Sequence, residues 1–276
     1  MGRRARSGVS RETSGKPDCM RAQIIINKFG IIQEGEGKKP PQGGVLARRT
    51  NRDLVVHLHN SVTVPALLCL LQALRAVDVQ MTLVGSTALP MTRAQICLTL
   101  ARRALSIVEG QHEDLFMSDL EIFNKEISTI DILPENLTKL VELNFSQMDA
   151  PSALMKASTA RVGNLVSVGQ TRSIRLYFLA LPENLAWPPD MPDISKPIDE
   201  VLSEPISTWL SIAYEATLSI QSPIYQHGIL KINPELRLPF QRVLNPITPS
   251  TNRPAHFRIL TTASVIGDHA DDVIII

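Results

Sequence analysis

The chain has 276 residues, of which 44% are apolar and 4% aromatic, so its composition is that of a folded protein and excludes disorder throughout. The net charge is +1, but it is unevenly distributed. Residues 1–52 hold twelve basic and four acidic side chains, a net +8, whereas residues 53–276 hold sixteen and twenty-three, a net −7. A basic head on an acidic body indicates an anionic partner, or contact between the head and the body.

The first 52 residues divide into two predicted parts. Residues 1–20 are rich in Gly, Ser, Arg and Lys and contain almost no large apolar side chain, so we expect a mobile basic tail. In residues 21–52, the short β-prone pieces Gln23–Ile26 and Ile31–Ile32 are followed by GEGKKPPQGG at 35–44. Glycine and proline at this density predict an exposed loop.

A predicted α+β lobe covers residues 53–181. Apolar and polar side chains alternate over Asp53–Asn60, which predicts a half-buried strand. A helix is expected from Thr63 to Val77, with proline in its first turn. A strand at Val79–Val84 and a second helix from Thr92 to Glu109 follow.

The rest of this lobe is expected to contain shorter elements. Two short strands are predicted within Leu120–Ile132, and Pro134 begins a short helix. Alternation returns over Ser173–Leu181, where Ile174, Leu176, Phe178 and Ala180 share one face.

Proline is concentrated in residues 182–205, which we interpret as a linker or loop before a β-rich lobe at 206–276. In Ile206–Ile220 seven of the eight even positions are apolar, and this favours a strand, although a helix would also place some apolar residues together.

Further strands are predicted at Ile224–Ile232 and Phe257–Ile266, whereas Pro239 places Leu236–Val243 at an edge or outside the sheet. The expected fold class is therefore α+β. We expect a mostly antiparallel sheet, two to three packed helices in the N-terminal half and a strand-rich C-terminal half.

No sequence motif of catalysis is recognised. Gly35–Lys39 resembles a phosphate loop but lacks the required first glycine and the hydroxyl residue. His57 and His59 would point the same way on a strand and could share a metal, but no further ligand pair accompanies them. We therefore predict a non-enzymatic protein with no cofactor and no metal, and keep an enzyme of unfamiliar type as an alternative.

Cysteine content and hydropathy bear on location. The three cysteines are widely spaced, which favours free thiols in a reducing compartment, cytoplasm or nucleus. The most apolar run, Val64–Leu74, is about half the length that a membrane-spanning helix needs, so no transmembrane span is expected.

The basic head provides the candidate contacts for an anion or a nucleic acid. Such contacts neutralise phosphates and weaken with salt. The first group precedes the Pro-Gly loop at 35–44 and comprises Arg3, Arg4, Arg6, Arg11 and Lys16. The second group flanks this loop and comprises Lys38, Lys39, Arg48, Arg49 and Arg52.

A resemblance to a known protein family is carried by three features: RRAR at 3–6, KKPP at 38–41, and the predicted strand and helix of Asp53–Val77. In this organisation the chain resembles matrix proteins of negative-strand RNA viruses, the plant rhabdovirus type in particular. The resemblance implies a structural protein of the virion that self-assembles and is present in the host nucleus.

The first functional hypothesis is a structural, matrix-like protein that self-associates through its apolar sheet or edge strands. Its basic region would contact nucleoprotein, RNA or an anionic membrane surface as a peripheral protein. The alternative is a viral movement or nucleic-acid-transport protein, which would bind single strands cooperatively.

Overall fold

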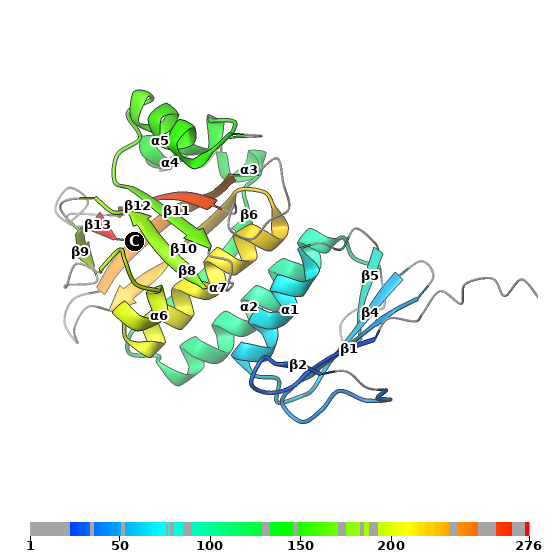
Figure 1. Ribbon diagram of the computed structural model, residues 1–276. Helices are drawn as coiled ribbons and strands as arrows, with labels where there is room; N and C mark the ends of the chain where they lie inside the picture. Colours follow the sequence, from blue (N-terminus) through cyan, green and yellow to red (C-terminus); the bar gives the residue numbers. More distant parts are fainter. Residues whose placement is uncertain are drawn as a thin grey trace, which may run out of the picture.

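The computed structural model contains two large β-sheets, with helices between them and on the outer side of one sheet, and a small parallel pair of strands (Figure 1). The structure describes residues 23–33, 36–50, 53–75, 77, 80–84, 90–128, 133–145, 148–170, 175–182, 185–187, 193–231, 237–247, 258–266 and 274–275.

The first sheet has five strands in the order β2-β1-β3-β4-β5, and only the pair β4–β5 is parallel. Helix α1 connects these two parallel strands. The predicted strands at the start of the chain and on either side of α1 are thus present in one sheet. Their bounds are β1 Gln23–Ile26, β2 Ile32–Gln33, β3 Val45–Arg49, β4 Asp53–Leu58, α1 Val64–Leu74 and β5 Gln80–Val84.

Three helices form the layer between the sheets: α1, α2 (Arg93–Gln111) and α7 (Glu204–Ile220) (Figure 1). The sequence predictions of α1 and α2 are confirmed. Thr92 closes the start of α2 because its hydroxyl accepts from the Gln95 amide while the Gln95 side chain accepts from the Thr92 amide. One continuous core joins both sheets to these helices.

The predicted strand at 206–220 is wrong, because these residues form α7. The helix is buried on nearly all sides, so its apolar residues do not form a single stripe. Two of its buried polar side chains bond to helix carbonyls: the Thr217 hydroxyl donates to the Ala213 carbonyl at 2.8 Å, and the Ser219 hydroxyl donates to the Leu71 carbonyl at 2.8 Å. Polar residues at odd positions therefore did not mark an exposed strand face.

The second sheet has six antiparallel strands in the order β6-β10-β11-β12-β7-β8. Three of them precede the proline-rich stretch 182–205 and three follow it, so both parts of the chain share one sheet. The strands are β6 Phe116–Ile122, β7 Leu165–Gln170, β8 Leu176–Ala180, β10 Ile224–Lys231, β11 Arg237–Ile247 and β12 Arg258–Val265.

The prediction that Pro239 keeps its segment at an edge or outside the sheet is wrong, because β11 is a central strand. The Pro239 carbonyl accepts from the Ile266 amide at 2.8 Å. The Pro239 nitrogen lies on the same side of the strand, beyond the last paired residue of β12, Val265. The N–H that proline lacks would therefore have pointed past the end of the hydrogen-bonded pairing between β11 and β12.

Helices α4 (Glu135–Glu142) and α5 (Ala150–Thr159) cover one end of the outer face of the six-stranded sheet (Figure 1). The predicted short helix after Pro134 is confirmed by α4. The second short strand expected within Leu120–Ile132 falls largely at 129–132, outside the described residues. The remaining elements are α3 Lys125–Ser128, β9 Leu185–Trp187, α6 Ile198–Val201 and β13 Ile274–Ile275.

The architecture is the α+β fold with mostly antiparallel sheets that the sequence predicts. In the described part of the chain, no helix combines the length and apolar character needed to cross a membrane.

The outer edge of β6 is capped by side chains of α2. Glu109 accepts from the Ser118 amide at 2.8 Å, and the Arg102 guanidinium donates to the Leu120 carbonyl at 2.8 Å. These contacts occupy backbone groups that would otherwise be free to pair with another strand.

Two other outer strands are capped by backbone contacts. Met81 of β5 exchanges two backbone hydrogen bonds with Met91, at 3.1 and 2.7 Å. Tyr177 of β8 forms an antiparallel bridge with Pro197, just before α6. β5, β6 and β8 are thus each covered at one or more positions.

Candidate surface for an anionic partner

The Pro-Gly loop is docked on the outer face of the five-stranded sheet. The carbonyl of Gly37 accepts from Gln23 Nε2 at 3.2 Å and from the Arg48 guanidinium. Leu46 points to this face opposite Ile25 and is completely buried. We call residues 36–42 the basic loop; its backbone is held in place by strands β1 and β3.

The described basic residues of this region have two different environments. Lys38 and Lys39 are exposed on the basic loop, and Arg49 is exposed at the end of β3. Arg48 is half-buried and holds the loop, so it is a positioning residue rather than a free contact. The other predicted contacts, Arg3, Arg4, Arg6, Arg11, Lys16 and Arg52, lie outside the described residues.

A tight turn joins β1 to β2 and forms the hairpin tip, residues 27–32. The Asn27 side-chain oxygen accepts from the amides of Phe29 and Ile31, at 2.9 and 3.0 Å. Gly30 has φ +74°, and a side chain there would come within 2.6 Å of the Pro65 carbonyl oxygen. The turn therefore has a fixed conformation and lies against the start of α1.

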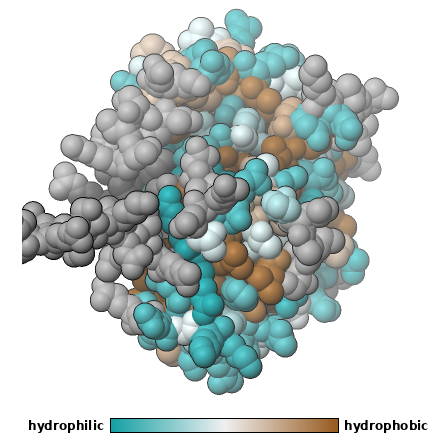
Figure 2. Space-filling model, turned by 90° about the vertical axis from the view of Figure 1, so that its right-hand side faces the viewer, coloured by the Kyte–Doolittle hydropathy of each residue, from teal (hydrophilic) through white to brown (hydrophobic). Residues whose placement is uncertain are grey.

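The hairpin tip exposes large apolar side chains. Phe29, Ile31 and Ile32 are 67%, 57% and 55% exposed. The Lys28 Nζ lies 5.0 Å from the centre of the Phe29 ring. Figure 2 faces the end of the molecule that holds this sheet and shows apolar side chains among polar ones.

The lysines of the basic loop were predicted from the sequence, whereas the hairpin tip was not. A usable signal was present, because Asn27-Lys-Phe-Gly30 is a turn sequence placed between three isoleucines on one side and two on the other. A phenylalanine at the apex of a turn has no neighbouring core to enter, and this pattern predicts its exposure.

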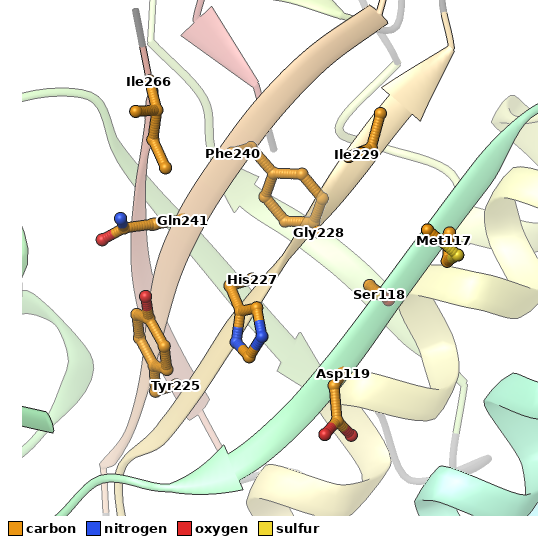
Figure 3. Close-up of a pocket in the computed structure, with 10 residues that line it drawn as sticks. All are labelled: Met117, Ser118, Asp119, Tyr225, His227, Gly228, Ile229, Phe240, Gln241 and Ile266. Atoms are coloured by element: carbon orange, nitrogen blue, oxygen red, sulfur yellow. The ribbon is translucent and has the colours of Figure 1, made fainter.

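A second candidate lies on the outer face of the six-stranded sheet, beyond the end that α4 and α5 cover (Figure 3). We call it the open-face pocket; it has a volume of about 430 Å³. Its lining comes from β6, β10, β11 and the residue after β12: Met117, Ser118, Asp119, Tyr225, His227, Gly228, Ile229, Phe240, Gln241 and Ile266.

The opposite face of this sheet holds an interior polar cluster around Arg242. Its guanidinium carbon lies 4.9 Å from the ring centre of Trp209, and its Nε donates to Gln226 at 2.6 Å. Gln226 in turn donates to the Ser118 hydroxyl at 2.9 Å, and that hydroxyl donates to Glu109 at 2.9 Å. The cluster thus runs from the core to the capped edge of β6.

Burial dominates the electrostatics of this cluster. It lowers the pKa of Arg242 and raises the pKa of Tyr214, which lies beside it. Arg242 and Trp209 are completely buried, so a substrate could reach them only if the sheet opened. The groups tie helix α7 to the sheet.

His57 and His59, which could share a metal by their spacing, have no additional metal-binding side chain beside them in the described part of the chain. His59 Nδ1 lies 2.9 Å from the Ser61 hydroxyl. Among the described residues, no group of three or more His, Cys, Asp or Glu side chains is placed to hold a metal ion.

Comparison with known proteins identifies no relative of this chain. No protein-family model matches the chain, and no match is found among curated proteins or among solved structures.

Proposed function

We propose that the protein is a non-enzymatic structural protein that self-associates and lies on an anionic membrane surface. The observation that carries the proposal is the hairpin tip, where Phe29, Ile31 and Ile32 are each more than half exposed beside Lys28. Lys38 and Lys39 extend the positive charge from the same sheet. Apolar side chains on an exposed turn, with Lys28 beside them and two more lysines on the basic loop of the same sheet, suit the interface between headgroups and acyl chains.

The energies are sufficient for reversible binding. Transfer of a large apolar side chain from water gains about 1.5–3 kcal/mol when burial is complete, so a half-exposed one gains on the order of 1 kcal/mol. Each lysine near an anionic leaflet adds about 1 kcal/mol. Three apolar residues and three lysines thus support attachment that weakens when salt is added.

The structural role is supported by the location of the perturbed charged groups. Burial shifts the pKa values of Arg242 and Glu215, and both lie in the interior, where they connect helices to the sheet. Groups tuned for catalysis need access to a substrate. These two groups serve packing.

Self-association through side-chain surfaces fits the structure better than pairing of strand edges. β5, β6 and β8 carry capping contacts, so the apolar residues of an open sheet face are the better candidates. Met117 is 60% exposed and Ile266 is 36% exposed, on two sides of the open-face pocket.

The test is co-sedimentation with vesicles of phosphatidylcholine alone or with phosphatidylserine, at low and high salt. We expect binding only to the anionic vesicles. The variant Phe29→Ser/Ile31→Ser should lose most of it, as should Lys38→Ser/Lys39→Ser. Met155→Ser is the matched control, because Met155 is 70% exposed on α5, away from the tip.

A parallel titration with single-stranded RNA separates the membrane role from nucleic-acid transport. A nucleic-acid-binding protein would lose RNA affinity with the lysines and keep it in the Phe29→Ser/Ile31→Ser variant. RNA binding with that pattern, without binding to anionic vesicles, would overturn the membrane proposal.

A further inference from the structure

The open-face pocket combines apolar walls with polar atoms that have no partner. Gln241 is only 3% exposed, and its side-chain oxygen has no hydrogen-bond partner within the described residues. His227 Nδ1 is also buried and unpartnered there. Both residues line the pocket (Figure 3). A buried acceptor without a donor costs about 1–3 kcal/mol, which a hydrogen-bond donor from a ligand would recover.

The pocket also offers an aromatic surface. The rings of Tyr225 and His227 are stacked with their centres 5.4 Å apart. Met117 stands on β6 at the opposite side and is largely exposed. Acceptors, aromatic faces and a thioether together favour a flat cation that carries N–H donors, and the guanidinium of arginine has this chemistry.

The β6 side of the pocket is acidic. The segment 109–126, which contains β6, carries six acids against one lysine, although Glu109 among them lies on the opposite face of the sheet, where it accepts from the Ser118 hydroxyl. Asp119 lines the pocket and is paired with Arg102, whereas Glu121 is its neighbour on the same face of β6. Lys231 and Arg237 lie on the same face at the other end of the pocket, where Lys231 follows the lining residue Ile229 by two positions. The β6 side therefore attracts a basic segment.

We propose that the open-face pocket binds an arginine from the N-terminal segment of a second copy of this chain. The segment 1–16 provides five basic side chains against one acid, with three arginines in RRAR at 3–6. Its charge complements the β6 side of the pocket. The proposal specifies the self-association in the proposed function, and it leaves the membrane contact to the hairpin tip.

The test uses a fluorescent peptide of residues 1–16 and the full chain carrying Arg3→Ser/Arg4→Ser/Arg6→Ser, so that its own segment does not compete. We expect binding by fluorescence anisotropy that weakens with salt. Gln241→Leu should weaken it at least tenfold by removing the buried acceptor. Met117→Ser, at an exposed position, should also weaken it without altering the melting temperature.

Reversing the charges of the N-terminal arginines and of an acid beside the pocket gives the most specific control. Arg3→Glu/Arg4→Glu/Arg6→Glu should abolish oligomers in light scattering, and Glu121→Lys in the same chain should restore them in part. Glu142→Lys, on the exposed side of α4, should not restore them. Peptide binding that is unchanged in both Gln241→Leu and Met117→Ser would overturn the proposal.

Vesicle binding separates this proposal from the proposed function. Gln241→Leu should bind anionic vesicles as well as the unmodified chain does, because the hairpin tip is unchanged. Loss of peptide binding with intact vesicle binding supports the pocket. Intact peptide binding with no vesicle binding would contradict the membrane role alone.

Discussion

Arg75, just after α1, forms a buried ion pair with Glu215 in the middle of α7. The side chains are 8% and 2% exposed. Arg75 also donates to Gln170 of β7, and Glu215 accepts from Gln72 at 3.1 Å and from Gln170 at 3.2 Å. One pair of charges thus connects two helices of the middle layer to the six-stranded sheet.

Removing one partner of this pair should be costly. Arg75→Met leaves the Glu215 carboxylate buried without its cation, and about 3–5 kcal/mol of unfolding free energy should be lost. Arg75→Met/Glu215→Leu should lose less than the sum of the single changes. Urea unfolding measures both. Arg175→Met is the control, because that arginine pairs with Asp199 and Glu200 at the surface and its loss should change stability little. Additive losses would refute the coupling.

Glu109 should make stability depend on pH. Burial raises the pKa of its carboxyl above 4.5, although the hydrogen bonds from Ser118 oppose this. The folded protein therefore keeps the proton to a higher pH than the unfolded chain does. Stability falls as pH rises from the unfolded pKa through the folded one, and is constant above it. Glu109→Gln should remove this fall in chemical denaturation between pH 4 and 8; an unchanged pH profile would contradict the shift.

Gly228 should not tolerate a side chain. A Cβ there would lie 2.7 Å from the Ser118 Cα and would overlap the Met117 carbonyl, both in the backbone of the adjacent strand. Gly228→Ala should therefore cost about 2–3 kcal/mol, because β6 and β10 must separate. Gly110→Ala is the matched control, because nothing lies within 4 Å of its added Cβ and the position is helical. It should stabilise by about 0.5–1 kcal/mol. Thermal melts compare the two variants.

Cys97 should resist thiol reagents in the folded protein. Burial raises the pKa of its thiol to about 12, although Arg93 and Arg75 lower it in part. At pH 8 only roughly one molecule in ten thousand then carries the reactive thiolate. In Cys19→Ser/Cys69→Ser, labelling by iodoacetamide should be very slow in native buffer and rapid in guanidinium chloride. Fast native labelling would show that α2 opens readily.

The helices α1 and α2 could be predicted from sequence because each has a clear start. Thr63 with Pro65, and Thr92, mark those starts. α7 also begins with a proline, Pro205, but its burial on nearly all sides removed the 3.6-residue pattern. The partners of its polar residues are distant in sequence: Glu215 meets Arg75, 140 residues away. No local pattern contains that information.

The candidate sites too could be predicted only where a local sequence pattern contains the information. Lysines in a Pro-Gly loop could be predicted as exposed, and Lys38 and Lys39 are. The inward role of Arg48 depends on where the loop folds back, which its own neighbours do not determine. The open-face pocket depends on pairing between β6 and β10, which are about a hundred residues apart in the chain.

The capping contacts of β5, β6 and β8 matter when many copies of the chain are crowded together. A chain that collects at a surface reaches a high local concentration, and bare strand edges would then act as templates for mispairing between neighbours. Glu109 and Arg102 at β6, Met91 at β5 and Pro197 at β8 already occupy positions along those edges. Copies that are crowded together could then meet through side chains while the six-stranded sheet, which is capped at both edges, keeps its own register.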